Sequence, residues 1–213
     1  NNRKIIMGHN RLSLRDLRSI ADQPFNSISS KSRIIFNGEI YNHLDLRRLL
    51  PSQDWRTNSD TETLIELLEA FGPTLILPKI EGMFSMIFHD LSTNNIFVAR
   101  DKSGIKPLFF THKENFSYLC FSSEIKSIKN YYSNFKFTIS ESAKNEYFYF
   151  GYIRQPKTIY EEIKSVPVDS FLKFDVSERK VYKIPYPTDD IHDNQDLESI
   201  LCTAIESRLH RLF

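Results

Sequence analysis

The sequence predicts an α+β fold built on antiparallel sheets. Three pairs of short apolar runs, each pair separated by a few polar residues, are typical of β-hairpins. Helical patterns are grouped between these pairs and do not alternate one for one with strands, which argues against a doubly wound parallel sheet. The 213 residues are 40% apolar and 13% aromatic, so they can fill a sizeable core. That composition excludes a disordered chain.

Individual strands and one short helix can be assigned to residue ranges. A buried strand is expected over residues 33–36, ending at Asn37-Gly38, which is a turn signal. A short helix is expected over residues 43–50, because Pro51 follows it. The strands of the three hairpins are expected over residues 83–90 with 96–100, 108–111 with 116–122, and 171–176 with 180–184.

The clearest helix is expected over residues 59–71. Ser59 and Glu62 have the Ser-x-x-Glu spacing of a capping box, in which each side chain bonds the other residue's backbone N–H. Gly72-Pro73 predicts the end of this helix. Its apolar residues recur three and four positions apart and therefore share one face: Leu64, Leu67, Leu68 and Phe71.

The composition changes after residue 184. Residues 185–195 contain three Asp and two Pro with hardly any apolar side chain, which predicts a linker. Asp196 then caps a last amphipathic helix that has nothing left to cover within the 213 residues. We therefore expect one domain over residues 1–184, and we interpret residues 196–213 as the first helix of a truncated second domain.

Charge and cysteine content limit the partners and the compartment. The 28 basic and 27 acidic residues give a net charge of +1, so neither nucleic acid nor an anionic membrane is expected as a partner. No apolar run approaches membrane-spanning length. Cys120 and Cys202 lie far apart and lack metal-site spacing, which fits a reducing compartment. We expect a cytoplasmic protein without a metal site in this domain.

Asn37 and Gly38 are the first candidates for chemistry. They follow a buried strand, where a backbone N–H and a side-chain amide can point at one atom. Two such donors form an oxyanion hole, which stabilises the negative charge that develops during acyl transfer. The alternative is an ordinary Asn-Gly turn.

Arg11 and Asp60 could bind the two charges of an amino acid. Arg11 lies beside apolar residues in an expected strand, where a guanidinium can grip a carboxylate with two parallel hydrogen bonds. Asp60 lies at a helix start, which keeps a carboxylate ionised and fixed for an ammonium group. The alternatives are a surface arginine and a plain helix-capping acid. His9 is expected to be a structural histidine.

The loop from Ala99 to Leu108 contains glycine and basic residues but lacks the spacing of a phosphate-binding loop. We expect a turn shaped by Pro107, with Arg100 and Asp101 paired to each other.

The order of the motifs is more specific than any one of them. It resembles the N-terminal half of glutamine-hydrolysing asparagine synthetases, a class II glutamine amidotransferase domain, over nearly the whole chain. Residues 166–170 depart from the Pro-Gly turn often found there. The matching blocks are Gly8-His9-x-Arg11-Leu12-Ser13-Leu14, Gln23-Pro24, Phe36-Asn37-Gly38-Glu39-Ile40-Tyr41-Asn42, Ser59-Asp60-Thr61-Glu62, Glu81-Gly82-Met83-Phe84, Ala99-Arg100-Asp101-x-x-Gly104-Ile105-Lys106-Pro107-Leu108 and Ser123-Glu124-Ile125-Lys126.

The resemblance implies the N-terminal-nucleophile fold, a four-layer α-β-β-α sandwich. It implies attack of a cysteine thiolate on the side-chain amide of L-glutamine, and transfer of the ammonia to a second domain. There, with ATP and Mg²⁺, an acceptor carboxylate is adenylated; no cofactor is implied for residues 1–184. The implied roles are an oxyanion hole from the Asn37 side chain and the Gly38 N–H, and glutamine contacts from Arg11 (α-carboxylate), Asp60 (α-ammonium), Glu39 and the backbone near Leu12 and Leu14.

The nucleophile of this family is a cysteine at the mature N-terminus. Asn1 has no thiol, and Cys120 and Cys202 are expected to be small buried residues. We therefore expect a segment that lacks its nucleophile and its synthetase domain and hydrolyses no glutamine. Two alternative functions stay open: amidation of an acceptor other than aspartate, such as a surface-sugar carboxylate, and a non-catalytic glutamine-binding or docking module. A homodimer also stays open.

Overall fold

The structure is a computed structural model that describes residues 5–11, 16–111, 119–187 and 196–209. Its larger sheet has six antiparallel strands, which are, in sheet order, β1 (Phe25–Asn26), β2 (Ser32–Ile40), β3 (Gly82–Asp90), β4 (Asn95–Arg100), β8 (Ser170–Asp175) and β9 (Lys180–Pro185). The smaller sheet has three, β6 (Phe121–Ser122), β5 (Phe109–Thr111) and β7 (Ile163–Ser165). The three expected hairpins are confirmed as β3–β4, β5–β6 and β8–β9.

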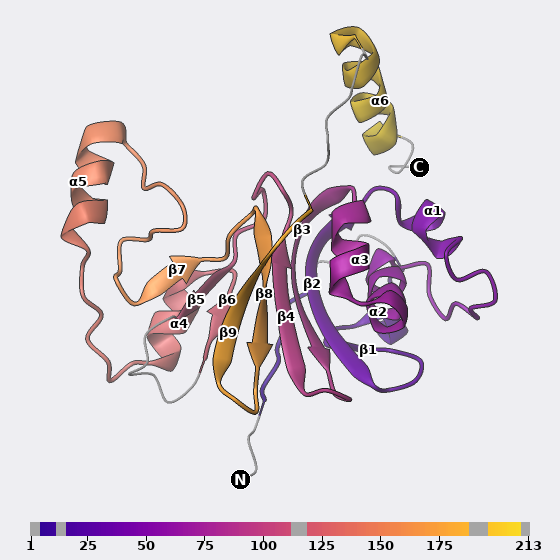
Figure 1. Cartoon of the computed structure of the whole chain (residues 1–213), viewed down its shortest axis with the longest axis horizontal. Helices are drawn as coiled ribbons and strands as arrows, with labels where there is room; N and C mark the ends of the chain where they lie inside the picture. The colour runs from indigo at the N-terminus through magenta and orange to yellow at the C-terminus, as the bar shows by residue number, and fades with distance from the viewer. Residues whose placement is uncertain (1–4, 12–15, 112–118, 188–195, 210–213) are drawn as a thin grey trace.

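The described helices lie around the two sheets, and some of them cover the outer faces of the sheets (Figure 1). They are α1 (His43–Arg47), α2 (Asp60–Phe71), α3 (Pro73–Ile76), α4 (Ile125–Tyr131), α5 (Glu141–Phe150) and α6 (Leu197–Leu209), with short 3-10 helices η1 (Ser19–Ala21) and η2 (Leu77–Lys79). Helix α2 packs on β2, and α4 contacts β5 and β6. The order helix, sheet, sheet, helix confirms the expected fold class.

Two apolar clusters hold these layers together. The first joins alternate residues of β2 and β3 to α2 and α3, and it includes Phe36, Ile40, Leu64, Leu67 and Phe84. The second lies between the sheets and includes Val98 and Leu172 of the larger sheet, with Phe110 and Phe121 of the smaller one packed against it. Each fully buried side chain of this size stabilises the fold by about 1.5–3 kcal/mol.

Strands β2 and β3 come unusually close at two glycines. A Cβ at Gly38 would lie 2.1 Å from the Met83 carbonyl oxygen, and one at Gly82 would lie 2.2 Å from the Glu39 carbonyl oxygen. Only glycine fits such an approach of two backbones. The expected turn at Asn37-Gly38 is therefore wrong: β2 continues through both residues, because pairing with β3 outweighs the local turn signal.

Helix α2 ends as expected, since Gly72 has a φ of +81° and Pro73 begins α3. Its start differs in one respect from the expected capping box. The Ser59 hydroxyl accepts the Glu62 N–H at 3.3 Å, but the Ser59 N–H donates to the Thr57 hydroxyl instead of to Glu62. The second hydrogen bond of the expected capping box, from the Ser59 N–H to the Glu62 side chain, is therefore wrong.

Two further expectations about local structure are corrected. The helix expected over residues 43–50 is shorter, because α1 ends at Arg47 and turns follow it. The described residues 5–11 form no strand, so Arg11 is held by side-chain and backbone contacts outside the sheet.

Helix α6 begins as expected, with the Asp196 carboxylate accepting the Ser199 N–H at 3.0 Å. The Arg208 guanidinium lies 4.8 Å from the centre of the Tyr41 ring, which follows β2. The end of α6 is thereby placed over the end of β2, as Figure 1 also shows. Whether residues 185–195 separate two domains stays a prediction, because residues 188–195 lie outside the described part.

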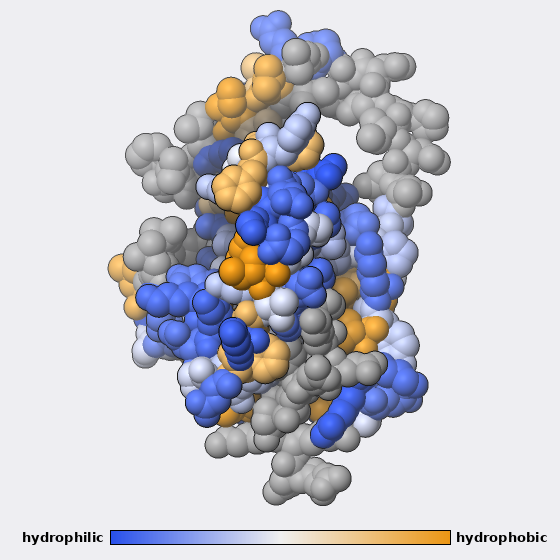
Figure 2. All heavy atoms as spheres, turned by 90° about the vertical axis from the view of Figure 1, so that its left-hand side faces the viewer, coloured by the Kyte–Doolittle hydropathy of each residue, from blue (hydrophilic) through white to orange (hydrophobic). Residues whose placement is uncertain are grey.

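Helix α5 stands apart from the sheets in Figure 1, and only Ala143 and Glu146 of this helix are buried. Phe148 and Tyr149 are 77% and 83% exposed. Figure 2 views this side of the molecule, where apolar side chains are scattered among polar ones. In the described ranges, no helix combines the length and the apolarity needed to cross a bilayer.

Candidate functional site

The edge of β2 that faces away from β3 is covered by side chains. Strand β1 pairs only with Arg33 and Ile34. Beyond that point, the Gln23 side chain donates to the Phe36 carbonyl at 2.9 Å and accepts the Phe36 N–H at 2.6 Å. Four residues further along, the Asp60 carboxylate accepts the Ile40 N–H at 3.0 Å. Two side chains therefore replace a strand on this edge.

The N–H of Gly38 points toward the same edge. Hydrogen-bonded and non-hydrogen-bonded pairs alternate along antiparallel strands. The Tyr41 N–H donates to the Glu81 carbonyl, so Tyr41 and Glu81 form a hydrogen-bonded pair. Three residues back along β2, Gly38 and Phe84 therefore form a non-hydrogen-bonded pair. In agreement, the Phe84 N–H is directed away from Gly38, to Asp101 at 3.2 Å. The Gly38 N–H thus lies between the backbone groups held by Gln23 and by Asp60.

Asn37 and Glu39 lie on the face of β2 opposite to Phe36 and Ile40, because successive side chains of a strand alternate. Asn37 is exposed, whereas Glu39 is half-buried. Both side chains therefore face away from the α2 layer. The predicted oxyanion pair is compatible with this geometry, but its donors come from inside a strand and not from a turn.

Arg11 already binds an acidic side chain. Its Nη1 lies 3.1 Å from Asp22 Oδ1, and its Nη2 donates to the Asp16 carbonyl at 2.6 Å. The Arg11 side chain is 14% exposed, whereas that of Asp22 is 64% exposed. A substrate carboxylate at Arg11 would therefore compete with the exposed side chain of Asp22. Nothing in the sequence indicated this competition.

Asp60 is buried at the first position of α2, where the helix dipole favours a negative charge. The segments that carry Arg11 and Asp60 are joined through Asp16. The Asp16 carboxylate accepts the Asn58 N–H at 3.1 Å, while its carbonyl accepts from Arg11. A bidentate bond from Arg18 holds the pKa of Asp16 well below its usual range, so this carboxylate stays ionised.

The structure therefore brings Gly38 and Asp60 to one strand edge and ties Arg11 to it through Asp16. Leu12 and Leu14, the remaining predicted contacts, lie outside the described residues. Sequence reasoning noticed Gln23 only as part of a motif and gave no role to Asp16 or Asp22. The positive φ of 42° at Asp16 belongs to a conformation that Asp adopts more readily than most residues, but nothing in the sequence indicated it.

His9 lies beside this network. Partial burial, followed by the nearby Arg11 guanidinium, lowers its pKa, although a hydrogen bond with the Phe36 backbone acts in the opposite direction. Its Nδ1 is buried and has no hydrogen-bond partner among the described residues. The neutral imidazole is therefore the favoured form next to Arg11. The structural role expected for His9 stays a prediction.

The loop after β4 is organised by Arg100 and Asp101, but not by a bond between them. Arg100 donates to the carbonyls of Lys106 and Gly104, each at 2.6 Å, and to the Ser165 hydroxyl at 2.9 Å. Asp101 accepts from the loop's own N–H groups, including that of Lys106 at 3.1 Å. The expected internal pair is thus replaced by two separate sets of backbone contacts.

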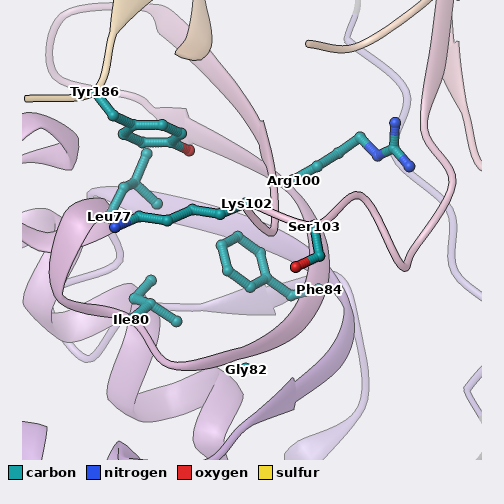
Figure 3. Close-up of a pocket in the computed structure, with 8 residues that line it drawn as sticks. All are labelled: Leu77, Ile80, Gly82, Phe84, Arg100, Lys102, Ser103 and Tyr186. Atoms are coloured by element: carbon teal, nitrogen blue, oxygen red, sulfur yellow. The ribbon is translucent and has the colours of Figure 1, made fainter. Parts of the chain in front are cut away.

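A cavity of about 170 Å³ lies beside this loop, on the α3 side of the larger sheet. Figure 3 shows Phe84 and Ile80 on its wall below the Tyr186 ring, whereas Arg100 points away from it. Its polar lining comes from Lys102, Ser103 and the Tyr186 hydroxyl; burial raises the pKa of Tyr186. The full lining is Leu77, Ile80, Gly82, Phe84, Arg100, Lys102, Ser103 and Tyr186. This cavity is separate from the edge of β2.

Neither cysteine belongs to the β2 edge. Cys120 is half-buried next to β6, and burial raises the pKa of its thiol. Cys202 is exposed on α6, so the expectation that it is buried is wrong. A thiol with a raised pKa holds little thiolate at neutral pH, which disfavours Cys120 as a nucleophile. Among the described residues, no three His, Cys, Asp or Glu side chains gather as a metal site.

Comparisons with known proteins agree with these features. Residues 1–186 match the family described as "Glutamine amidotransferase domain". The chain is 38% identical over 125 residues to an asparagine synthetase (glutamine-hydrolysing) of Bacillus subtilis, covering 59% of this chain and 16% of that protein. A putative asparagine synthetase of Methanocaldococcus jannaschii is 30% identical over 200 residues, covering 87% of this chain and 38% of that one.

An asparagine synthetase of Lotus japonicus is 30% identical over 95% of this chain and 34% of its own length. The match thus spans less than two fifths of each of these relatives. Two solved structures share the fold. A glutamine phosphoribosylpyrophosphate amidotransferase from B. subtilis has a TM-score of 0.50 and 18% identity, and the match covers 78% of this chain and 32% of that one. An allosteric regulatory enzyme of purine biosynthesis has a TM-score of 0.51 and 17% identity, and the match covers 78% of this chain and 31% of that one. The chain belongs to the glutamine amidotransferase domain family.

Proposed function

We propose that this chain binds L-glutamine at the edge of β2 and forms the glutamine-hydrolysing part of an ATP-dependent amide-forming ligase. The observation that carries the proposal is that the Gly38 N–H faces the same edge of β2 as the Asp60 carboxylate, which bonds the Ile40 N–H two residues further along. A donor for an oxyanion and a fixed anion for an ammonium group suit the two ends of one amino acid.

In this proposal the carboxamide oxygen of glutamine lies at the Gly38 N–H and the Asn37 amide. The α-ammonium lies at Asp60, and the α-carboxylate lies at Arg11, where it replaces Asp22. Glu39 and the backbone near Leu12 and Leu14 complete the pocket. Arg11 is suited to this role because its guanidinium already holds one carboxylate and one carbonyl.

The reaction follows from these positions. A thiolate sulfur bonds to the carboxamide carbon, and the oxygen takes up the negative charge against the two donors. The carbon–nitrogen bond then breaks, the nitrogen takes a proton and leaves as ammonia, and water releases glutamate from the thioester. In family members the thiolate is that of an N-terminal cysteine; in this chain Cys120 is half-buried next to β6 and Cys202 is exposed on α6.

In this proposal a second domain uses the ammonia. By similarity to the asparagine synthetases, we propose a synthetase domain that uses ATP and Mg²⁺ to adenylate a carboxylate such as that of aspartate, in a cytoplasmic enzyme. A surface-sugar carboxylate is the alternative acceptor. If the 213 residues act alone, a non-catalytic glutamine-binding module is the second candidate, because no described thiol lies at the β2 edge.

Titration calorimetry of the 213-residue chain tests the binding step that both candidates share. We expect saturable heat with L-glutamine and a much weaker signal with D-glutamine, whose α-groups cannot reach Arg11 and Asp60 together. Equal signals for the two enantiomers, or none for L-glutamine, would contradict the proposal. Ammonia release by the full-length gene product, with and without aspartate and ATP, then separates the ligase from the binding module.

A further inference from the structure

The loop of residues 56–59 leads directly into Asp60, and side chains bind all four of its backbone N–H groups. The Arg56 and Thr57 N–H groups donate to the two carboxylate oxygens of Glu62, at 3.1 and 2.7 Å. The other two donate to the Asp16 carboxylate at 3.1 Å and to the Thr57 hydroxyl at 3.2 Å. Three of the four N–H groups are thus bound by side chains from outside the loop, and the fourth is bound by the loop's own Thr57.

Glu62 is the centre of this arrangement. It is 0% exposed, and besides the two N–H groups it accepts from Arg56 Nε at 3.0 Å and from the Thr57 hydroxyl at 2.8 Å. The carbonyl groups of the same loop are bound by Arg47, at 2.9 Å for Thr57 and 3.1 Å for Ser59. An anion therefore holds the N–H side of the loop while a cation holds its carbonyl side.

We propose that Glu62 is a positioning residue for glutamine binding, which acts by fixing the loop that sets the orientation of the Asp60 carboxylate. Glu62 itself does not touch the substrate. The proposal rests on the proposed function, since it assumes that Asp60 binds the α-ammonium group. A capping box alone does not explain Glu62, because its carboxylate bonds to Arg56 and Thr57 and the Ser59 N–H bonds elsewhere.

Helix α2 offers a matched control. Glu66, one turn further along, is also buried and accepts a backbone N–H, that of Ile28 at 2.7 Å. Its carboxylate bonds the turn after β1 and no backbone N–H of the loop before Asp60; toward that loop it makes only an ion pair with the Arg56 side chain, at 3.8 Å. Glu62→Gln and Glu66→Gln each replace one buried acceptor oxygen by a donor on the same helix, so a purely structural role predicts similar losses of stability and the same effect on binding.

The test compares two ligands by titration calorimetry of the 213-residue chain: L-glutamine, and 4-carbamoylbutyrate, which is glutamine without the α-amino group. We expect Glu62→Gln to weaken glutamine binding by about tenfold and to leave binding of the analogue within about twofold. Glu66→Gln should change neither affinity by more than about twofold. Thr57→Val, which removes only the bridging hydroxyl, should weaken glutamine binding in the same direction and covers the case in which Glu62→Gln does not fold.

Three results would overturn the inference. These are unchanged glutamine affinity in folded Glu62→Gln and in Thr57→Val, equal loss of affinity for both ligands, or equal loss in Glu66→Gln. If the wild-type chain binds no glutamine, the proposed function fails and the inference falls with it. If the wild-type chain binds glutamine and the variants give one of these three results, the proposed function stands and Glu62 has only a structural role.

Discussion

The Asp60 carboxylate bonds the backbone N–H of Ile40 at 3.0 Å, across twenty residues of chain. This bond joins the first residue of α2 to the last residue of β2. It also places a negative charge two residues from Gly38, whose N–H faces the same edge. The contact is thus both a link between helix and sheet and the basis of the proposed glutamine site.

Asp60→Asn should separate these two roles. The amide oxygen of asparagine can still accept the Ile40 N–H, but it carries no charge for an ammonium group. We expect L-glutamine to bind at least about tenfold more weakly, with little change in the urea midpoint. Asp45→Asn, on the exposed side of α1, is the control. Wild-type affinity in Asp60→Asn would remove Asp60 from the site.

Asp22→Asn should strengthen glutamine binding. Asp22 bonds Arg11 at 3.1 Å and would have to give way to the α-carboxylate of the substrate. Because Asp22 is largely exposed, the gain should be small, about two- to fivefold in affinity. Calorimetry of this variant beside Asp169→Asn, which removes an exposed partner of Lys183, gives the comparison. Weaker binding in Asp22→Asn would show that Asp22 supports Arg11.

Gly38→Ala should destabilise the fold. The added methyl group would lie 2.1 Å from the Met83 carbonyl oxygen, and a backbone cannot move away as a flexible side chain can. We expect a loss of at least about 1–3 kcal/mol in the free energy of unfolding from urea titration. Gly8→Ala serves as the control, since a Cβ there meets no atom within 4 Å. Equal stability of the two variants would contradict the close approach.

His9 should make stability depend on pH. Its pKa in the folded protein lies below the ordinary value of 6.5, so the unfolded chain binds a proton more readily. Stability is therefore greatest above the unfolded-state pKa and decreases as the pH falls through it. Urea midpoints at about pH 7.5 and about pH 5.5 should differ less in His9→Gln than in the wild type. The same difference in both proteins would assign the pH dependence to other groups.

The 213-residue chain should release no ammonia from glutamine. The thiol of Cys120 has a raised pKa, and Cys202 lies on α6, so no described thiolate can attack a carboxamide at Gly38. A coupled ammonia assay against a no-enzyme blank measures this. Activity above the blank that disappears in Cys120→Ser or Cys202→Ser would show that the described thiol does reach the site.

The hairpins and α2 could be predicted because their signals are local. Apolar runs around short polar connections define β3–β4 and β8–β9, and the spacing of apolar residues defines α2. Asn37-Gly38 was misread for the opposite reason. Its dipeptide is typical of a turn, but the strand continues because β3 lies against it, and no local window contains that partner.

The residues of the site were predictable as types but not as a network. An arginine and an aspartate suit an amino acid, and the order of the blocks indicated the family. The bond from Asp22 to Arg11, and the two bonds from Gln23 to Phe36, join residues more than ten positions apart through side chains. Such contacts depend on how distant segments pack together, so periodicity and capping rules cannot predict them.

The side chains on the outer edge of β2 have a consequence for the behaviour of the protein in concentrated solution. An uncovered strand edge can pair with a strand of another molecule and start aggregation. Gln23 occupies both backbone groups of Phe36, and Asp60 occupies the N–H of Ile40. A neighbouring chain therefore finds no continuous row of hydrogen-bonding groups to extend.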